Sequence, residues 1–176
     1  CTASGGATGS CEVGDSFNAG EASISGIELI AKTEMTSASG TRYPLSAVFT
    51  STDAEFNNTF DSDFWGSVTA GMEIPDLPDS QLVLQAGFET QDGLTGSATF
   101  YSYGSTCSVA SCAAGTEVDS YSVIDASLTQ AINESLDVYL VVSNLTDETD
   151  VIARAPKNGA RAQMPRSFLV GVRYRL

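Results

Sequence analysis

Apolar residues recur at every second position in seven stretches of the chain, which is the pattern of β-strands whose two faces meet different surroundings. The last stretch, RSFLVGVRYRL, places five apolar side chains on one face: Phe168, Val170, Val172, Tyr174 and Leu176. Its opposite face carries Arg173 and Arg175. Turn residues separate the stretches, and none has a convincing helical period. The pattern predicts an all-β fold.

We predict an antiparallel meander of about seven strands. The expected ranges are 21–34, 44–54, 80–90, 93–103, 119–131, 135–145 and 166–176. The connections alternate in length: QDG and INE are short, whereas 55–79, 104–118 and 146–165 are long. MTSASGTRY, between the first two strands, is a moderate exception on the short side.

Sorting of short turns to one end and long loops to the other is typical of an outer-membrane β-barrel, which keeps short turns in the periplasm and long loops outside. Its apolar face meets lipid and its polar face lines the lumen. The alternative is a soluble β-sandwich, which buries its apolar face against a second sheet. That alternative corresponds to a secreted, disulfide-stapled adhesin or binding module.

Length and hydropathy leave both alternatives open. The chain has 176 residues and a mean hydropathy of +0.01, with no apolar stretch long enough for a transmembrane helix. This criterion does not detect barrel strands, because their apolar and polar residues alternate and give a mean hydropathy near zero. The first residue is Cys, not Met, and no leader follows it, so we expect a mature or incomplete chain. A lipid-modified amino-terminal Cys1 is an alternative.

Charge is distributed unevenly along the chain. The net charge is −14, and residues 1–152 contain all 22 acids with only Lys32 and Arg42 as basic residues. The other six basic residues follow position 152. Nucleic acid is excluded as a partner of the main body, because phosphate binding needs a basic field. The acids are typical of solvated outer loops.

Four cysteines form two close pairs, Cys1 with Cys11 and Cys107 with Cys112. Their positions in Gly/Ser/Ala-rich segments favour two local disulfides in loops that face an oxidising compartment. A zinc site is the alternative, but the chain has no His and no C-x-x-C spacing.

Several segments resemble a known family. They are NLTD at Asn144–Asp147, a Gly-Ala-Arg loop at Gly159–Arg161, PRSFLVGVRY from Pro165, and the upstream runs NAGEASISGIELIA, PLSAVFTSTDAEF and EIPDLPDSQLVLQAGFE. Together they resemble the carboxyl-terminal end of TonB-dependent outer-membrane receptors, nearest to the ferric dicitrate type. The chain departs from the family's usual terminal Phe, because it ends on Leu176.

The resemblance implies a partial structure and a function. The family's barrel has 22 strands and a plugged lumen. Seven strands would be its last third, so residues 1–176 would be one carboxyl-terminal barrel segment without the plug, the TonB box or the earlier strands. The first and last strands would be open edges, which lipid does not tolerate. We therefore expect a fragment of a longer protein, or a piece held by a partner that supplies the rest.

The whole receptor is then expected to import a ferric chelate, such as a siderophore or ferric citrate. It would lie in the Gram-negative outer membrane and be energised by the TonB inner-membrane complex. Haem, cobalamin or a glycan are alternative ligands. No catalysis and no cofactor are expected. GDSF (Gly14–Phe17) has the residues of a hydrolase nucleophile block, but the usual His base is missing.

Candidate ligand-binding residues lie in the outer loops. Arg154, Lys157 and Arg161 offer cations to an anionic chelate, and Trp65 offers a ring for stacking. The alternatives are pairing of these cations with acidic loops or lipopolysaccharide phosphates, and a place for Phe64 and Trp65 in the aromatic girdle.

Acidic residues provide two further expectations. Four of them could supply the oxygen ligands that Ca²⁺ prefers, namely Asp53, Glu55, Asp61 and Asp63. Their spacing matches no calcium-binding motif, so a solvated outer loop is the preferred interpretation. Alternation also assigns a set of polar residues to the lumen, where they would pack against the plug: Glu28, Lys32, Gln85, Glu89, Asp125, Asp137, Arg173 and Arg175.

Overall fold

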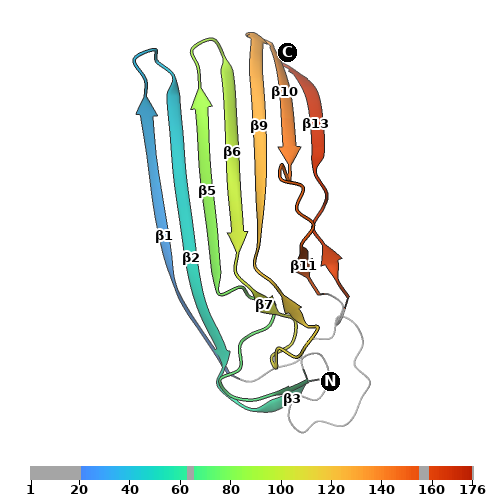
Figure 1. The fold of residues 1–176 in the computed structure, drawn as a ribbon. Helices are drawn as coiled ribbons and strands as arrows, with labels where there is room; N and C mark the ends of the chain where they lie inside the picture. Colours follow the sequence, from blue (N-terminus) through green and yellow to red (C-terminus); the bar gives the residue numbers. More distant parts are fainter. Residues whose placement is uncertain (1–20, 63–65, 155–158, 176) are drawn as a thin grey trace.

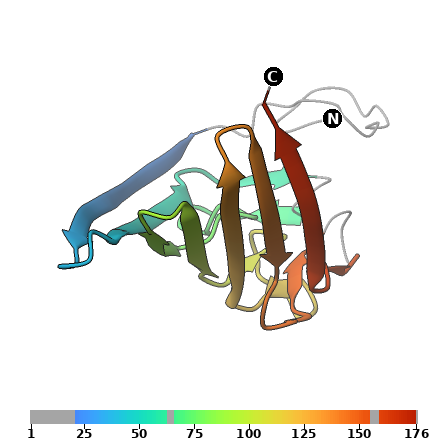
Figure 2. The ribbon, with the colours of Figure 1, turned by 90° about the horizontal axis from the view of Figure 1, so that it is seen from above.

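One antiparallel sheet of seven strands dominates the computed structural model, which describes residues 21–62, 66–154 and 159–175. The strands are β1 (Ala22–Thr36), β2 (Arg42–Phe56), β5 (Ser80–Glu89), β6 (Leu94–Tyr103), β9 (Tyr121–Asn133), β10 (Leu136–Ser143) and β13 (Ser167–Tyr174). They lie side by side in chain order (Figure 1), and Figure 2 shows that the sheet is curved. The predicted meander is confirmed, with boundaries within two residues of those expected. The described residues include no helix able to cross a membrane.

The connections are sorted by length between the two ends of the sheet (Figure 1). Residues 37–41, 90–93 and 134–135 form the short-turn end, and residues 57–79, 104–120 and 144–166 form the long-loop end. The expected exception between β1 and β2 is wrong, because both strands extend further than predicted. Ser37 N–H donates to the Thr41 carbonyl at 2.9 Å, and Gly40 supplies the left-handed conformation of the turn at φ 80°.

Three small hairpins in the long loops were not predicted. They are β3 (Phe60–Ser62) with β4 (Gly66–Val68), β7 (Thr106–Cys107) with β8 (Glu117–Val118), and β11 (Val151–Ala153) with β12 (Arg161–Ala162). Strands of two or three residues are too short to display an alternating pattern. The β7–β8 hairpin continues the β6–β9 ladder in the same register, since Tyr103 pairs with Tyr121 and Thr106 with Val118.

The apolar face of the seven-stranded sheet is uncovered. Leu84 in the middle of the sheet is 41% exposed, and Val170 at its edge is 70% exposed. The described residues contain only two-stranded sheets besides this one. The sandwich alternative is therefore wrong for the described chain, since a sandwich covers its apolar face with a second sheet.

The opposite face is polar. The strand registers align Lys32 with Ser46, Ser46 with Gln85, Gln85 with Thr99, and Thr99 with Asp125, which makes a polar row across five strands. Arg173 pairs with Asp137 on the same face. The predicted grouping of the lumen residues on one face is thus confirmed. A groove of about 600 Å³ lies near the short-turn end of this face.

Close packing is found at the long-loop end. Phe56, Phe60, Val68 and Ala110 form a buried cluster, and Met72 and Ile74 pack against it. The cluster joins the β2–β5 loop to the β6–β9 loop. Val68 is fully buried, and the Phe56 and Phe60 rings meet edge to face with centroids 5.3 Å apart. The two loops are therefore held together by their own hydrophobic core.

Candidate functional site

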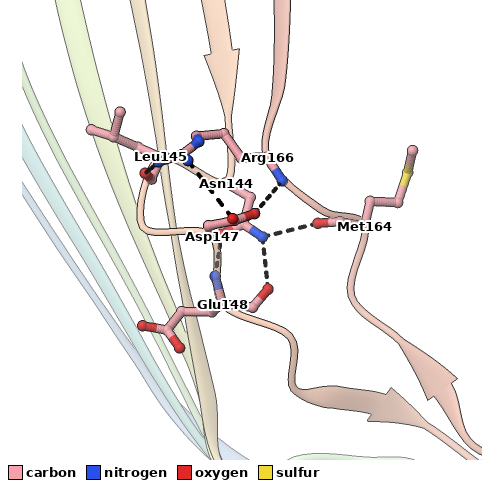
Figure 3. Close-up of polar contacts among 6 residues, drawn as sticks. All are labelled: Asn144, Leu145, Asp147, Glu148, Met164 and Arg166. Carbon is pink, nitrogen blue, oxygen red and sulfur yellow. Dashed lines mark hydrogen bonds and ion pairs between the residues drawn. The ribbon is translucent and has the colours of Figure 1, made fainter.

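Two sequence motifs, one at each end of the β10–β13 loop, meet at the base of that loop (Figure 3). Asn144 and Asp147 follow β10, and Arg166 precedes β13. Together with backbone groups of Leu145, Glu148 and Met164 they make a network that we call the loop clasp. The loop clasp fixes where the chain leaves the sheet and where it returns.

Asn144 is the centre of the loop clasp. Its side-chain Nδ2 donates to the carbonyls of Glu148 at 2.8 Å and Met164 at 2.9 Å, and its Oδ1 accepts from the Glu148 N–H at 3.1 Å. The residue is 3% exposed and has a φ of 53°, a left-handed conformation that Asn tolerates better than most residues. One amide therefore satisfies three backbone groups from both arms of the loop.

Asp147 and Arg166 form the second half of the clasp. The Arg166 N–H donates to Asp147 Oδ1 at 2.9 Å, and the guanidinium lies 3.7 Å from Asp147 Oδ2. Arg166 also donates to the Leu145 carbonyl at 3.2 Å. The ion pair is exposed and contributes little by itself. The bonds to backbone groups fix the geometry.

The clasp also reaches the neighbouring strand β9. Asn144 N–H donates to Asp125 Oδ1 at 2.9 Å, and Leu145 N–H donates to the Ile124 carbonyl at 2.7 Å. These bonds join the ends of three strands, so the base of the β10–β13 loop is anchored to the sheet.

The structure brings two of the four predicted ligand residues to neighbouring positions. Ala153 pairs with Arg161 in the β11–β12 hairpin, and Arg154 follows Ala153. Arg154 Nε donates to the Glu117 carbonyl of β8 at 2.5 Å, whereas Arg161 is exposed. Lys157 and Trp65 lie outside the described residues. The assignment of these residues to a ligand stays a prediction.

Cys107 and Cys112 form the expected disulfide, with their Cα atoms 5.2 Å apart. Between them, Ser108, Val109 and Ala110 are buried. Ala110 belongs to the cluster with Val68, so the disulfide holds one partner of the loop core. The predicted pair Cys1 and Cys11 lies outside the described residues.

Replacing both Cys107 and Cys112 with Ser is expected to destabilise the loop core by about 2 kcal/mol. Without the cross-link, the segment between the two positions has a higher conformational entropy in the unfolded state. Cleavage of the β6–β9 loop by a protease measures this change. Reduction of the wild-type protein should reproduce it, and equal cleavage before and after reduction would contradict it.

Metal binding finds no support in the described part of the chain, where no group of three acidic, Cys or His side chains is arranged to hold an ion. Asp61 instead accepts a hydrogen bond from Ser67 at 2.7 Å, and Asp63 lies outside the described residues. In the same loop, partial burial raises the pKa of the Asp76 carboxyl.

Ion pairs occupy the polar face toward the short-turn end. Arg42 contacts Glu89 and lies 3.9 Å from Glu34. Arg175 forms an ion pair with Asp137 at 2.5 Å, and Asp137 is 4% exposed. These charges lie at the opposite end from the loops, so they are not part of the candidate ligand site.

Sequence reasoning missed two features at the long-loop end. Tyr101, Tyr103 and Tyr121 share the polar face where β6 ends and β9 begins, which the alternation in FYSY indicates once the face is known. Gln163 is 8% exposed, and its side-chain oxygen and nitrogen have no hydrogen-bond partner within the described structure. No sequence signal marks Gln163.

Known proteins resemble the chain in sequence and in fold. The family model "TonB dependent receptor-like, beta-barrel" matches residues 2–145. The siderophore receptor PiuA from Acinetobacter baumannii has a TM-score of 0.74 and 22% identity, over 87% of this chain and 22% of that receptor.

Two further solved structures have the same fold. The ferric-catecholate import receptor Fiu from E. coli K12, in its closed form, has a TM-score of 0.60 and 20% identity, over 87% of this chain and 25% of its own. The ferric yersiniabactin uptake receptor FyuA from Yersinia pestis has a TM-score of 0.59 and 19% identity, over 86% of this chain and 23% of that receptor. No curated protein matches. The chain thus spans about a quarter of the length of these receptors.

Proposed function

The chain belongs to the TonB-dependent receptor-like β-barrel family, and from this premise we propose that it is a wall segment of an outer-membrane receptor that imports an anionic ferric chelate. The observation that carries the proposal is the division of the sheet into an uncovered apolar face and a polar face, with all long loops at one end. Lipid would meet the apolar face, and the ligand would enter between the loops.

The segment would contribute the carboxyl-terminal end of the barrel. β1 and β13 each pair on one side only within the described chain, and such open edges need further strands in a membrane. Residues 1–176 would therefore be one barrel segment of a longer protein that supplies the plug and the preceding strands. The polar face, with its groove and its ion pairs, would pack against that plug.

Import would involve no bond chemistry in this segment. The chelate, a siderophore or ferric citrate, would be recognised outside by Arg154, Lys157, Arg161 and Trp65. The TonB complex of the inner membrane would act through the plug. Lipid and lipopolysaccharide of the Gram-negative outer membrane would surround the apolar face.

Replacing Arg154 and Arg161 together with Ala in the complete receptor is expected to weaken binding of an anionic ferric chelate about tenfold, because two charge-assisted contacts are lost at a partly hydrated site. Titration of the purified receptor with ferric dicitrate and with a ferric catecholate measures the change. Arg42→Ala, at the short-turn end, is the matched control and should bind as the wild type does. Unchanged affinity in the double variant would refute this role for the two arginines.

A further inference from the structure

One rung of the β7–β8 hairpin has backbone groups that point toward the neighbouring loops. Cys107 and Glu117 lie opposite each other in this rung. The next rung is hydrogen-bonded, since Ser108 N–H donates to the Thr116 carbonyl at 2.9 Å. Rungs of an antiparallel ladder alternate between hydrogen-bonded and non-hydrogen-bonded pairs, so the backbone groups of Cys107 and Glu117 point away from the hairpin. Their carbonyls can therefore bind other parts of the chain.

Each carbonyl of the Cys107–Glu117 rung binds a different loop. Asp76 N–H, in the β2–β5 loop, donates to the Cys107 carbonyl at 2.9 Å. Arg154, which follows β11 in the β10–β13 loop, donates from Nε to the Glu117 carbonyl at 2.5 Å. β11 also lies beside β8. One rung thus connects the three long loops of the chain.

The disulfide restrains this rung. Cys107 is cross-linked to Cys112, and within the closed segment Cys112 N–H donates to the Val109 carbonyl at 3.0 Å. Ala110, in the same segment, packs in the loop core with Val68. Cys112 is exposed, so a reductant in solution can reach the sulfur atoms. Loss of the cross-link would give the segment, and Cys107 at its start, more freedom to move.

Arg154 can hold the hairpin and a ligand at the same time. Its Nε–H is used by the Glu117 carbonyl, and the terminal nitrogens of the guanidinium carry further N–H donors. An anionic chelate can accept hydrogen bonds from these donors. Because the bond to Glu117 orients the side chain before a ligand arrives, less conformational entropy is lost on binding. The affinity that Arg154 contributes therefore depends on the position of Glu117.

We propose that the Cys107–Cys112 disulfide positions Arg154 for the chelate, so that chelate affinity depends on the redox state of this disulfide. A dithiol supplies two electrons and two protons to the disulfide, which gives two Cys thiols and the cyclic disulfide of the reductant. The Cys107–Glu117 rung then loosens, Arg154 loses its support, and the chelate binds more weakly. The inference rests on the proposed function and adds a regulatory property to its ligand site.

Equilibrium titration of the complete receptor before and after reduction tests the proposal. The probes are ferric dicitrate and the ferric complex of 2,3-dihydroxybenzoate, and the dithiol is removed before titration because it would reduce the ferric ion. Reduction should raise the Kd of the probe that the receptor binds about 5-fold. The double variant Cys107→Ser/Cys112→Ser should bind as the reduced wild type does and should not respond to the dithiol, which excludes any other disulfide as the cause.

Arg154→Ala separates a positioning role from a general loosening of the loops. Without the link to Glu117, reduction should change the Kd less than about 2-fold. A second readout needs no ligand, because Gln163 N–H donates to the Asp150 carbonyl in the same loop. Hydrogen exchange of this amide should accelerate on reduction of the wild type but not of Arg154→Ala. Arg161→Ala is the matched control, since it removes an exposed cation from the same loop and should retain the redox response.

The outcomes distinguish this inference from the proposed function. An unchanged Kd after reduction of the wild type overturns the redox dependence and leaves the proposed function intact. An equal response with and without Arg154 overturns the positioning role, because the disulfide would then act without this arginine. If Arg154→Ala binds neither probe, hydrogen exchange at Gln163 decides between these results. Failure of the oxidised wild type to bind either ferric probe overturns the proposed function and this inference with it.

Discussion

Asn144→Ala is expected to destabilise the base of the β10–β13 loop by about 3 to 4 kcal/mol. The substitution removes three side-chain hydrogen bonds and leaves the N–H and carbonyl of Glu148 and the carbonyl of Met164 without their partner. It also places Ala at a φ of 53°, which costs Ala more than Asn. Because Arg154 and Arg161, which we propose bind the chelate, lie in the same loop, the proposed function predicts weaker chelate binding as well.

Protease cleavage between residues 148 and 163, in the receptor held in outer-membrane vesicles, measures the loss of order. Asn133→Ala is the control, since the Asn133 side chain accepts a single hydrogen bond, from Ser135 N–H, in an exposed short turn. We expect rapid cleavage for the first variant and wild-type resistance for the second. Equal resistance of all three proteins would mean that the loop clasp does not hold the loop.

Val68→Asp is expected to separate the two loops that share the hydrophobic core, with a cost of about 4 kcal/mol. Val68 is fully buried beside Phe56, Phe60 and Ala110, so a carboxylate there would lose its water and gain no cation. Resistance of the β2–β5 and β6–β9 loops to protease should fall together, because they pack on each other.

Thr69→Asp adds the same charge at the next, exposed position and should leave both loops intact. The seven-stranded sheet should remain in both variants, since Phe56, the last residue of β2, is the one described core residue that also belongs to the sheet. Loss of resistance in the β2–β5 loop alone would show that the two loops are independent.

Alternation was enough to predict the sheet. Each strand carries polar side chains on one face and mostly apolar ones on the other, so a period of two residues locates it, and Lys32, Gln85 and Asp125 were correctly grouped on one face. Turn residues such as QDG located the short-turn end. The turn at Gly40 is shorter than predicted, because the β1–β2 ladder continues through two further residue pairs, Met35 with Tyr43 and Thr36 with Arg42.

Contacts between distant residues were not predictable from one sequence. Asn144 was visible as part of a motif, but its bond to Met164 spans 20 positions and depends on where the loop returns. The contact of Arg154 with the Glu117 carbonyl involves a backbone group, which has no residue-specific signal. The loop core arises from Phe60, Val68 and Ala110, which come from one- or two-residue apolar stretches in otherwise polar segments.

Uptake of radioactive iron by Gram-negative cells tests whether this chain forms the wall of a TonB-dependent importer. Cells that express the complete receptor are compared with cells that lack it and with cells that lack the TonB complex, each supplied with one ferric chelate at a time. We expect uptake of at least one chelate only when the receptor and the TonB complex are both present. Equal uptake in all three strains for every chelate would contradict it.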